Sequence, residues 1–275
     1  MNYSQKHVII TGGSSGIGKA TAKLLASLGA NISIIARNEN VLATAKAEIE
    51  VMRSHSTQDI IAISADVADR TQAEQAIDRA INQIGPPDLL ITSAGIAHPG
   101  YFQELPIEIY ENTMAINYFG SLYCIKAVLP AMEQRRQGHI VLISSGAGLI
   151  GVYGYTPYSP TKFALRGLAE SLRGELKVAG IGLSIVYPPD TDTPQLEQEN
   201  KTKPLETKMI TSTAKTWSAE GVAREIVQGI EKKSFSITPG VEMTLLAWLN
   251  SLLLPILNLY FDRIVAKVLR EERIP

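Results

Sequence analysis

Hydrophobic residues in this chain form short, nearly continuous runs that alternate with longer amphipathic stretches. The runs rich in β-branched and aliphatic residues predict buried strands: Val8–Thr11, Ile32–Ala36, Ile60–Ala65, Leu89–Ser93, Ile140–Ser144 and Leu183–Tyr187. Stretches with helical apolar periodicity predict helices at Gly18–Leu28, Val41–Arg53 and Gln72–Ile84. The first and third of these end at a glycine, Gly29 and Gly85, which favours a left-handed cap. Strands that alternate with helices predict an α/β fold with a single doubly wound parallel sheet.

Two segments depart from this alternation. The polar stretch 188–217 is rich in Thr, Glu and Lys and follows the last predicted strand. Long connections at such a position often cover a binding site. The segment Met243–Phe261 contains no charged residue. We therefore expect residues 1–240 to form one domain with 188–217 as its lid, and residues 241–275 to form an apolar helical extension.

The composition excludes several classes of protein. Of the 275 residues, 45% are hydrophobic and 19% are charged, which is typical of a globular protein with a sizeable core. The net charge of -1 gives no general attraction to nucleic acid, so no nucleic-acid partner is expected. A single cysteine excludes an internal disulfide, and the 4 histidines are too scattered for a metal site. The N-terminus lacks an apolar signal-peptide core, which predicts a cytosolic location for the bulk of the chain.

A glycine-rich loop, Thr11–Gly18, follows the first predicted strand and opens the first predicted helix. Glycines at this position let the backbone turn sharply and approach a pyrophosphate, whose charge is favoured at a helix N-terminus. A tight turn without a ligand is the alternative interpretation. The predicted dinucleotide-binding residues in this loop are Gly12, Ser14, Ser15, Gly16, Ile17 and Gly18.

The glycine spacing, Gly-x-x-x-Gly-x-Gly, is one residue wider than the usual dinucleotide fingerprint and resembles the short-chain dehydrogenase/reductase superfamily. The resemblance implies a Rossmann-type fold and a nicotinamide cofactor. It assigns the adenine contact to Asp66 and Val67, and a second cofactor segment to Ala94 and Gly95. Ser93 stands where the superfamily has asparagine. Thr193 matches the threonine that contacts the amide or phosphate side of the cofactor.

Arg37 bears on the choice of cofactor. It follows the second predicted strand, where a protein that binds NAD needs Asp or Glu for the ribose 2′-hydroxyl. An arginine without that acid suits a 2′-phosphate, which a guanidinium grips with two parallel hydrogen bonds. We therefore expect NADPH as the cofactor. A solvated surface arginine is the alternative.

A second set of residues occurs in the order and spacing of the same superfamily: Asn117, Ser145, Tyr158 and Lys162. The resemblance implies that Tyr158 protonates a carbonyl oxygen held by Ser145, that Lys162 also grips the nicotinamide ribose, and that Asn117 holds a water that relays protons. Tyr158 and Lys162 would share one helix face, and the ammonium should lower the pKa of the phenol. Pro160 fits only if the helix begins near Ser159.

Several segments are similar to the 3-ketodihydrosphingosine reductases, over roughly residues 5–235. The most specific is the run 188–207, which begins Pro-Pro-Asp-Thr-Asp-Thr-Pro. This resemblance implies NADPH-dependent reduction of the 3-keto group of a long-chain sphingoid ketone, in sphingolipid synthesis at a membrane. The head of that substrate would lie between Ile150–Tyr155 and the lid. Asp190 and Asp192 are either turn and cap residues or contacts for its ammonium.

Two other functions compete with this one. The first is reduction of another lipid ketone, such as a 3-oxoacyl thioester or a steroid, because the same catalytic residues serve all of these substrates. The second is a non-catalytic NADP-binding scaffold at a membrane. The intact set of Asn117, Ser145, Tyr158 and Lys162 argues against the scaffold.

The uncharged segment Met243–Phe261 would reach about 28 Å as a helix, close to the roughly 30 Å of a bilayer core. Asn250, Pro255 and Asn258 make it a poor straight span. Basic residues lie on both sides of it: Lys232, Lys233, Arg263, Lys267 and Arg270. We therefore expect residues 243–270 to contact a membrane surface as an interfacial or re-entrant anchor, with the catalytic domain facing the cytoplasm. A helix packed on the body, or on another copy in a homo-oligomer, is the alternative.

Overall fold

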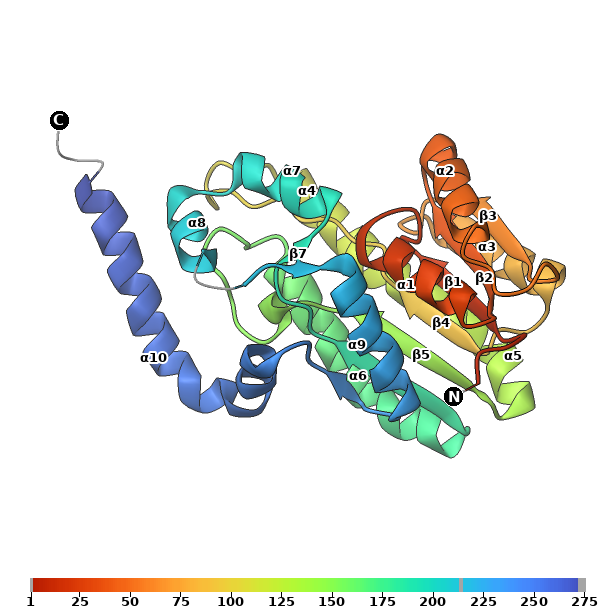
Figure 1. The fold of residues 1–275 in the computed structure, drawn as a ribbon. Coiled ribbons are helices and arrows are strands. Elements are labelled where there is room, and N and C mark those ends of the chain that lie inside the picture. The colour runs from red at the N-terminus through yellow and green to blue at the C-terminus, as the bar shows by residue number, and fades with distance from the viewer. Residues whose placement is uncertain (1, 213–214, 272–275) are drawn as a thin grey trace.

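The β-branched runs form one parallel sheet at the centre of the molecule (Figure 1). The computed structural model describes residues 2–212 and 215–271, so Met1, residues 213–214 of the expected lid and residues 272–275 of the expected extension lie outside it. Within this part, a seven-stranded sheet has the order β3-β2-β1-β4-β5-β6-β9, with every neighbouring pair parallel. Its strands are β1 (His7–Thr11), β2 (Asn31–Ala36), β3 (Ile60–Ser64), β4 (Leu89–Thr92), β5 (Gly138–Ile143), β6 (Ile181–Val186) and β9 (Ser236–Ile237).

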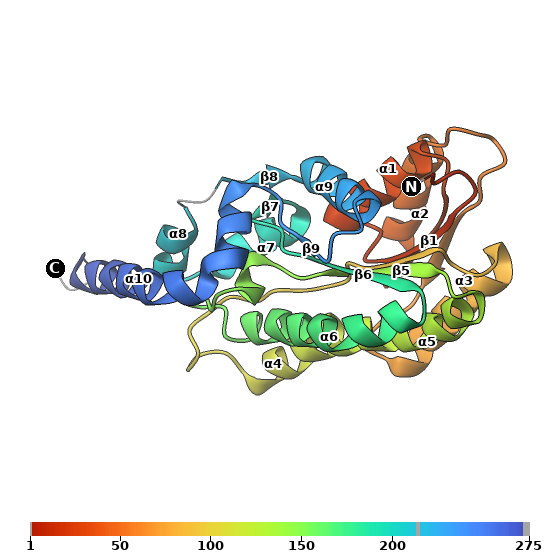
Figure 2. The same cartoon turned by 90° about the horizontal axis from the view of Figure 1, so that it is seen from below.

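Helices cover both faces of the sheet (Figure 2). One face carries α1 (Gly16–Ser27), α2 (Glu39–Glu50) and α9 (Ala219–Glu231), and the other carries α3 (Arg70–Ile84), α5 (Gly120–Arg135) and α6 (Ser159–Val178). The residues of strand β1 are mostly apolar because both faces of the strand are buried. Val8 and Ile10 pack in the core with Leu25 of α1, whereas Ile9 packs in the opposite core with Ile77 of α3. The predicted doubly wound parallel sheet is confirmed.

Polar side chains cap the starts of α2 and α3, so these two helices begin before their apolar periodicity does. Helix α2 begins at Glu39, two residues ahead of the predicted Val41, because the Asn38 side chain accepts a hydrogen bond from the Val41 N–H. It also ends at Glu50, short of the predicted Arg53. Gly29 and Gly85 both have positive φ, at 95° and 108°, as the sequence predicts for the glycines that end α1 and α3.

Strands β1 and β4 form the point at which the chain reverses its direction across the sheet. From β1 the chain builds outward through β2 and β3, and from β4 it builds the other way through β5 and β6. The loops that follow β1 and β4 therefore diverge to opposite faces and leave a crevice at the carboxyl edge of the sheet. Ligands of open α/β sheets bind in such a crevice.

The expected lid is folded rather than open. It contains strand β7 (Thr191–Asp192), helices α7 (Pro194–Thr202) and α8 (Leu205–Thr211), and strand β8 (Trp217–Ser218). β7 and β8 pair in parallel, which ties the start of the segment to its end. Helix α4 (Ile107–Met114) comes from the segment after β4. The folded lid thus lies beyond the carboxyl ends of β5 and β6.

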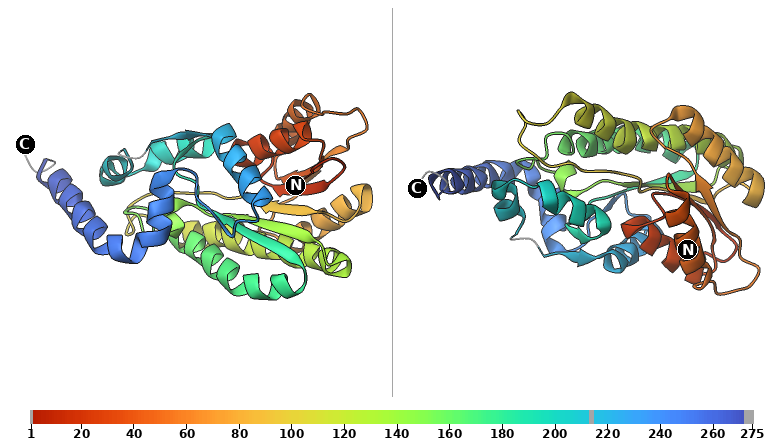
Figure 3. Two further views of the ribbon diagram at one scale, coloured as in Figure 1. Left: turned by 60° about the horizontal axis from the view of Figure 1, so that its bottom comes forward. Right: turned by 90° about the horizontal axis from the view of Figure 1, so that it is seen from above.

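Helix α10 (Val241–Glu271) carries the uncharged segment and extends away from the sheet (Figure 3). It bends along its length and contains Pro255, the residue type that most often kinks a helix. Its outer face is apolar and exposed, with Trp248 at 81% and Leu252 at 73%. Ile264 and Val268 are buried, and α10 contacts α8. Among the described residues, α10 alone is long and apolar enough to cross a membrane.

Candidate active site

Tyr158 and Lys162 lie at the start of α6, next to the end of β5. Pro160 lies in the first turn of α6, where its missing N–H leaves no helix hydrogen bond unmade, so the predicted start near Ser159 is confirmed. The Lys162 Nζ lies 5.3 Å from the centre of the Tyr158 ring and donates a 3.0 Å hydrogen bond to the Ile143 carbonyl. Both side chains are buried. The helix turn and the end of β5 together fix the lysine beside the phenol.

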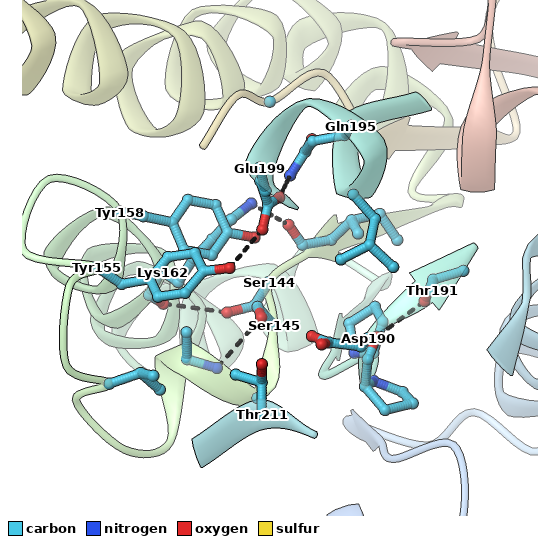
Figure 4. Close-up of a pocket in the computed structure, with 18 of the residues that line it drawn as sticks. Ser144, Ser145, Tyr155, Tyr158, Lys162, Asp190, Thr191, Gln195, Glu199 and Thr211 are labelled. Carbon is cyan, nitrogen blue, oxygen red and sulfur yellow. Dashed lines mark hydrogen bonds between the residues drawn. The ribbon is translucent and has the colours of Figure 1, made fainter. Parts of the chain in front are cut away.

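Ser145 faces Tyr158 from the loop that follows β5 (Figure 4). Its hydroxyl favours the phenolate form of Tyr158 and accepts a 3.2 Å hydrogen bond from the Ala147 N–H. This bond holds the serine rotamer. Two hydroxyl groups therefore point toward the same place, as polarisation and protonation of one carbonyl oxygen require.

Asn117 lies in a π-helical turn, Ala115–Phe119, just before α5, and its side chain is fully buried. Its amide makes both hydrogen bonds of a pair with the Ile96 backbone, at 2.8 Å and 3.0 Å, and donates to the Thr161 hydroxyl at 3.0 Å. Asn117 thereby fixes the segment after β4 against α6. A π-helical turn inside a longer helix often marks a functional site. The water that the resemblance assigns to Asn117 stays a prediction.

The pKa of Tyr158 is raised above its usual value. Burial is the main cause, followed by the negative charge of Glu199, and Asp190 acts in the same direction. The side chains of Ser145 and Gln195 favour the phenolate, but their effect is outweighed. Tyr158 therefore holds its proton at neutral pH.

Burial lowers the pKa of Lys162 to about 8, with the charge of Glu199 acting in the opposite direction. The sequence predicts that the Lys162 ammonium lowers the pKa of the phenol. That prediction is wrong for this structure, where burial and the charge of Glu199 raise the pKa of Tyr158.

The glycine-rich loop adopts backbone geometry that only glycine tolerates easily. Gly12 has a φ of 68°, and a Cβ there would lie 2.7 Å from the Ala94 backbone nitrogen. A Cβ on Gly18 would overlap the Gly12 carbonyl oxygen. At the start of α1, the Ser15 side chain makes no capping hydrogen bond, so the first backbone N–H groups are free to meet an anion. This loop fits the pyrophosphate of a dinucleotide.

Arg37, Asp66 and Val67 lie together at the ends of β2 and β3. The Arg37 Nη1 is 3.9 Å from the Asp66 Oδ2, and the two side chains are 58% and 36% exposed. Val67 is buried and packs close to Gly120. The guanidinium therefore projects into solvent beside the crevice, paired only loosely with a carboxylate.

Most of the predicted site residues border a single cavity of about 420 Å³. Those on its wall are Gly12, Ser15, Gly16, Ile17, Ala94, Gly95, Ser145, Tyr158, Lys162 and Thr193. Those outside the wall are Ser14, Gly18, Arg37, Asp66, Val67 and Asn117. Ile150, Val152 and Tyr155 also border the cavity, together with residues of α7, α8 and α10. The two segments expected to hold the substrate head, Ile150–Tyr155 and the lid, thus both contribute residues to the wall of this cavity.

A polar cluster around the buried Glu199 of α7, shown in Figure 4, lies outside the set of predicted site residues. Glu199 is only 7% exposed and accepts hydrogen bonds from the Tyr155 hydroxyl at 2.5 Å and the Gln195 amide at 2.8 Å. The Tyr155 ring lies 5.7 Å from that of Tyr158. The i,i+4 spacing of Gln195 and Glu199 is a signal for their contact on a helix, but not for burial.

The two aspartates of the lid differ in their surroundings. Asp190 borders the cavity and lies 3.8 Å from Lys203, whose side chain is 2% exposed. Asp192 is exposed, in line with its interpretation as a turn residue. The cap of α7 is instead Thr193, whose hydroxyl accepts a 3.3 Å hydrogen bond from the Leu196 N–H.

Known proteins resemble this chain in sequence and in fold. Residues 6–204 match the short chain dehydrogenase family. A 3-dehydrosphinganine reductase of Danio rerio is 43% identical over 254 residues, covering 92% of this chain and 76% of that protein. A 3-ketodihydrosphingosine reductase of Dictyostelium discoideum is 43% identical over 281 residues, covering 96% and 84%. A solved short chain dehydrogenase/reductase from Burkholderia phymatum, in complex with NAD, superposes with a TM-score of 0.82 at 22% identity, over 93% of this chain and 96% of that one. Levodione reductase superposes with a TM-score of 0.78 at 22% identity, over 86% and 95%.

Proposed function

This chain belongs to the short chain dehydrogenase family, and from that premise we propose that it reduces 3-ketodihydrosphingosine to dihydrosphingosine with NADPH, a step of sphingolipid biosynthesis. The membership makes it an oxidoreductase. The substrate rests on its similarity to the reductases from Danio rerio and Dictyostelium discoideum. The observation that carries the proposal is the cavity, which has Tyr158 and Ser145 in its polar part and apolar side chains of α10 on its wall. A ketone with a polar head and a long apolar tail matches this division.

The family and the glycine-rich loop support a nicotinamide dinucleotide as the cofactor, and the choice of NADPH rests on Arg37. The free N–H groups at the start of α1, with Gly12 and Gly16 beside them on the cavity wall, would hold the pyrophosphate. Arg37 would bind the 2′-phosphate and Lys162 the nicotinamide ribose. When bound, this cofactor supplies the hydride that the ketone carbon accepts.

Tyr158 acts as the acid in this proposal. Its raised pKa keeps the phenol protonated at neutral pH, which suits reduction because the carbonyl oxygen gains a proton as the carbon gains hydride. Ser145 donates a hydrogen bond to the same oxygen. Lys162, fixed by the Ile143 carbonyl, stands beside the ring, and Asn117 holds the neighbouring loop in place. Return of the proton to Tyr158 through Lys162 and a water at Asn117 is part of the proposal.

The substrate tail would leave the cavity along α10. Side chains from both halves of this helix border the cavity: Met243, Leu246, Leu257, Tyr260 and Phe261. On its outer side, Ile256 is 64% exposed and Leu259 is 59% exposed. The helix thus presents apolar groups both to the cavity and to its surroundings. We propose that the outer side rests in the apolar part of a membrane surface, with the catalytic domain on the cytoplasmic side.

The test of the proposed function is a comparison of substrates. NADPH oxidation by the full chain in mixed micelles is measured with 3-ketodihydrosphingosine and with a 3-oxoacyl thioester of similar length. We expect kcat/KM for the sphingoid ketone to be higher by at least about tenfold, or roughly 1.4 kcal/mol. A ratio near one, or a preference for the thioester, would replace this proposal with reduction of lipid ketones in general.

A further inference from the structure

Glu199 is a buried carboxylate on the wall of the catalytic cavity. It projects from α7 toward the two tyrosines of the site, and Figure 4 shows it between Tyr155 and Gln195. Both hydrogen-bond partners, the Tyr155 hydroxyl and the Gln195 amide, are neutral groups. Each carboxylate oxygen accepts one of these bonds and keeps a lone pair free. The two bonds fix the orientation of the carboxylate and leave it room for a further donor.

A buried carboxylate is costly unless a cation or several hydrogen bonds compensate its charge. Within residues 2–212 and 215–271, no basic side chain forms an ion pair with Glu199. Its charge instead acts on the catalytic pair, raising the pKa of Tyr158 and opposing the effect of burial on Lys162. A cation bound at Glu199 would remove this influence. Among the described residues, Glu199 therefore lacks an ion-pair partner of its own.

Other carboxylates are less suited to supply this contact. Asp190 borders the cavity but already lies 3.8 Å from the Lys203 ammonium. Asp192 is exposed to solvent. Glu206 is buried, but it is not on the described wall of the cavity. Glu199 alone among these four combines burial, a place on the wall and neutral partners.

We infer that Glu199 binds the ammonium beside the carbonyl of the substrate, and that it makes this site selective for α-amino ketones over ketones without the amino group. The inference rests on the proposed function, which supplies the ketone. Glu199 is a specificity-determining residue here, and Tyr155 and Gln195 are its positioning residues. The proton donor and the ammonium contact lie side by side, which matches the adjacent positions of the carbonyl and amino groups in the substrate.

The experiment compares two ketones on the full chain with NADPH in the same mixed micelles. One is 3-ketodihydrosphingosine, and the other is the same molecule with hydrogen in place of its 2-amino group. Both are tested on the wild-type protein, on Glu199→Gln, and on Glu197→Gln as the matched control. Glu197 lies on the same helix but is exposed. Glutamine keeps the shape of the side chain and its capacity to accept from Tyr155, and removes the charge.

We expect the wild-type kcat/KM to favour the amino ketone by at least about tenfold, the scale of a hydrogen bond to a charged group. Glu199→Gln should lower kcat/KM for the amino ketone about tenfold or more and leave the deaminated ketone within about threefold. Its Kd for NADPH should change little, because the hydrogen bonds of Glu199 are to Tyr155 and Gln195 rather than to the glycine-rich loop. Glu197→Gln should behave as wild type with both ketones.

Three outcomes would overturn the inference. The first is equal wild-type kcat/KM for the two ketones, a result that needs no variant and holds even if Glu199→Gln does not fold. The second is an equal loss with both ketones in Glu199→Gln, which indicates a structural role. The third is reduction of neither ketone, which overturns the proposed function as well. Equal use of the two ketones would leave the proposed function standing and remove only the assignment to Glu199.

Discussion

Replacing Arg37 with alanine should weaken binding of NADPH and leave binding of NADH almost unchanged. The two cofactors differ only in the 2′-phosphate, so the difference reports on the group that this phosphate meets. In the structure Arg37 is 58% exposed, and its Nη1 lies 3.9 Å from Asp66. An exposed pair at this distance contributes about 0–1 kcal/mol. Arg37→Ala should therefore leave the melting temperature of the protein nearly unchanged.

The magnitude follows from the charge-assisted hydrogen bonds that a guanidinium gives a phosphate, about 1.5–3 kcal/mol. Release of Asp66 from its pair with Arg37 costs up to about 1 kcal/mol of this. The net loss on Arg37→Ala is then roughly 0.5–3 kcal/mol, which raises the Kd for NADPH about 2- to 150-fold. Asp66 stays behind in the variant, where its charge repels the phosphate and favours the upper part of this range.

The assay is a titration of each reduced cofactor by its fluorescence, with wild type, Arg37→Ala and Arg70→Ala. Arg70 is the matched control, because it is a 72% exposed arginine in an ion pair with Glu74. Arg70→Ala should change neither the Kd for NADPH nor the Kd for NADH. In the wild type, added salt should weaken the binding of NADPH more than that of NADH, because salt screens an exposed contact with the phosphate. Equal wild-type affinities for the two cofactors, or an equal loss of both in Arg37→Ala, would refute this account of Arg37.

Three further predictions concern the acid, the buried lysine and α10. Tyr158→Phe should abolish turnover and preserve the Kd for NADPH, whereas Lys162→Ala should damage both; substantial kcat in Tyr158→Phe would remove Tyr158 as the acid. Lys162→Met should raise the free energy of unfolding below about pH 8, where the folded protein must hold a buried ammonium. The unfolded chain binds that proton more tightly, so the free energy of unfolding of the wild type rises as the pH increases from about 8 to 10.5. The stability advantage of Lys162→Met over the wild type, measured by urea titration, should therefore vanish as the pH passes 10.5. Truncation after Pro239 should move the protein from the membrane to the soluble fraction and keep NADPH binding; a full chain that is soluble without detergent and ignores liposomes would contradict the membrane proposal.

The fold could be predicted because its signals are local. Each buried strand is a run of residues that pack on both faces, as Ile9 and Ile10 do on opposite sides of β1. The helix boundaries needed one more local signal, the cap. The apolar period of α2 becomes visible at Val41, but Asn38 already starts the helix. Reading caps together with periodicity would have placed that boundary correctly.

The candidate site could be predicted only where a motif spans it. Tyr158, Lys162 and Ser145 follow a known spacing, and the structure brings them together. Glu199 lies in a polar run of the lid that is typical of a solvated helix, and only the packing of α7 against Tyr155 buries it. The prediction of a lowered pKa at Tyr158 failed for the same reason. The neighbouring lysine is visible in the sequence, but the burial and the distant carboxylate are not.

Helix α10 borders the cavity with one side and exposes aliphatic groups on the other, and this arrangement affects how the chain length of a substrate should be read. A tail that passes from lipid into an apolar cavity exchanges one hydrocarbon phase for another. The roughly 0.8 kcal/mol per methylene that drives a tail out of water then cancels. Chain length should therefore matter little when the ketone is supplied in vesicles, and saturation should depend on its mole fraction in the bilayer rather than on its bulk concentration. Discrimination among substrates then falls almost entirely to the polar head.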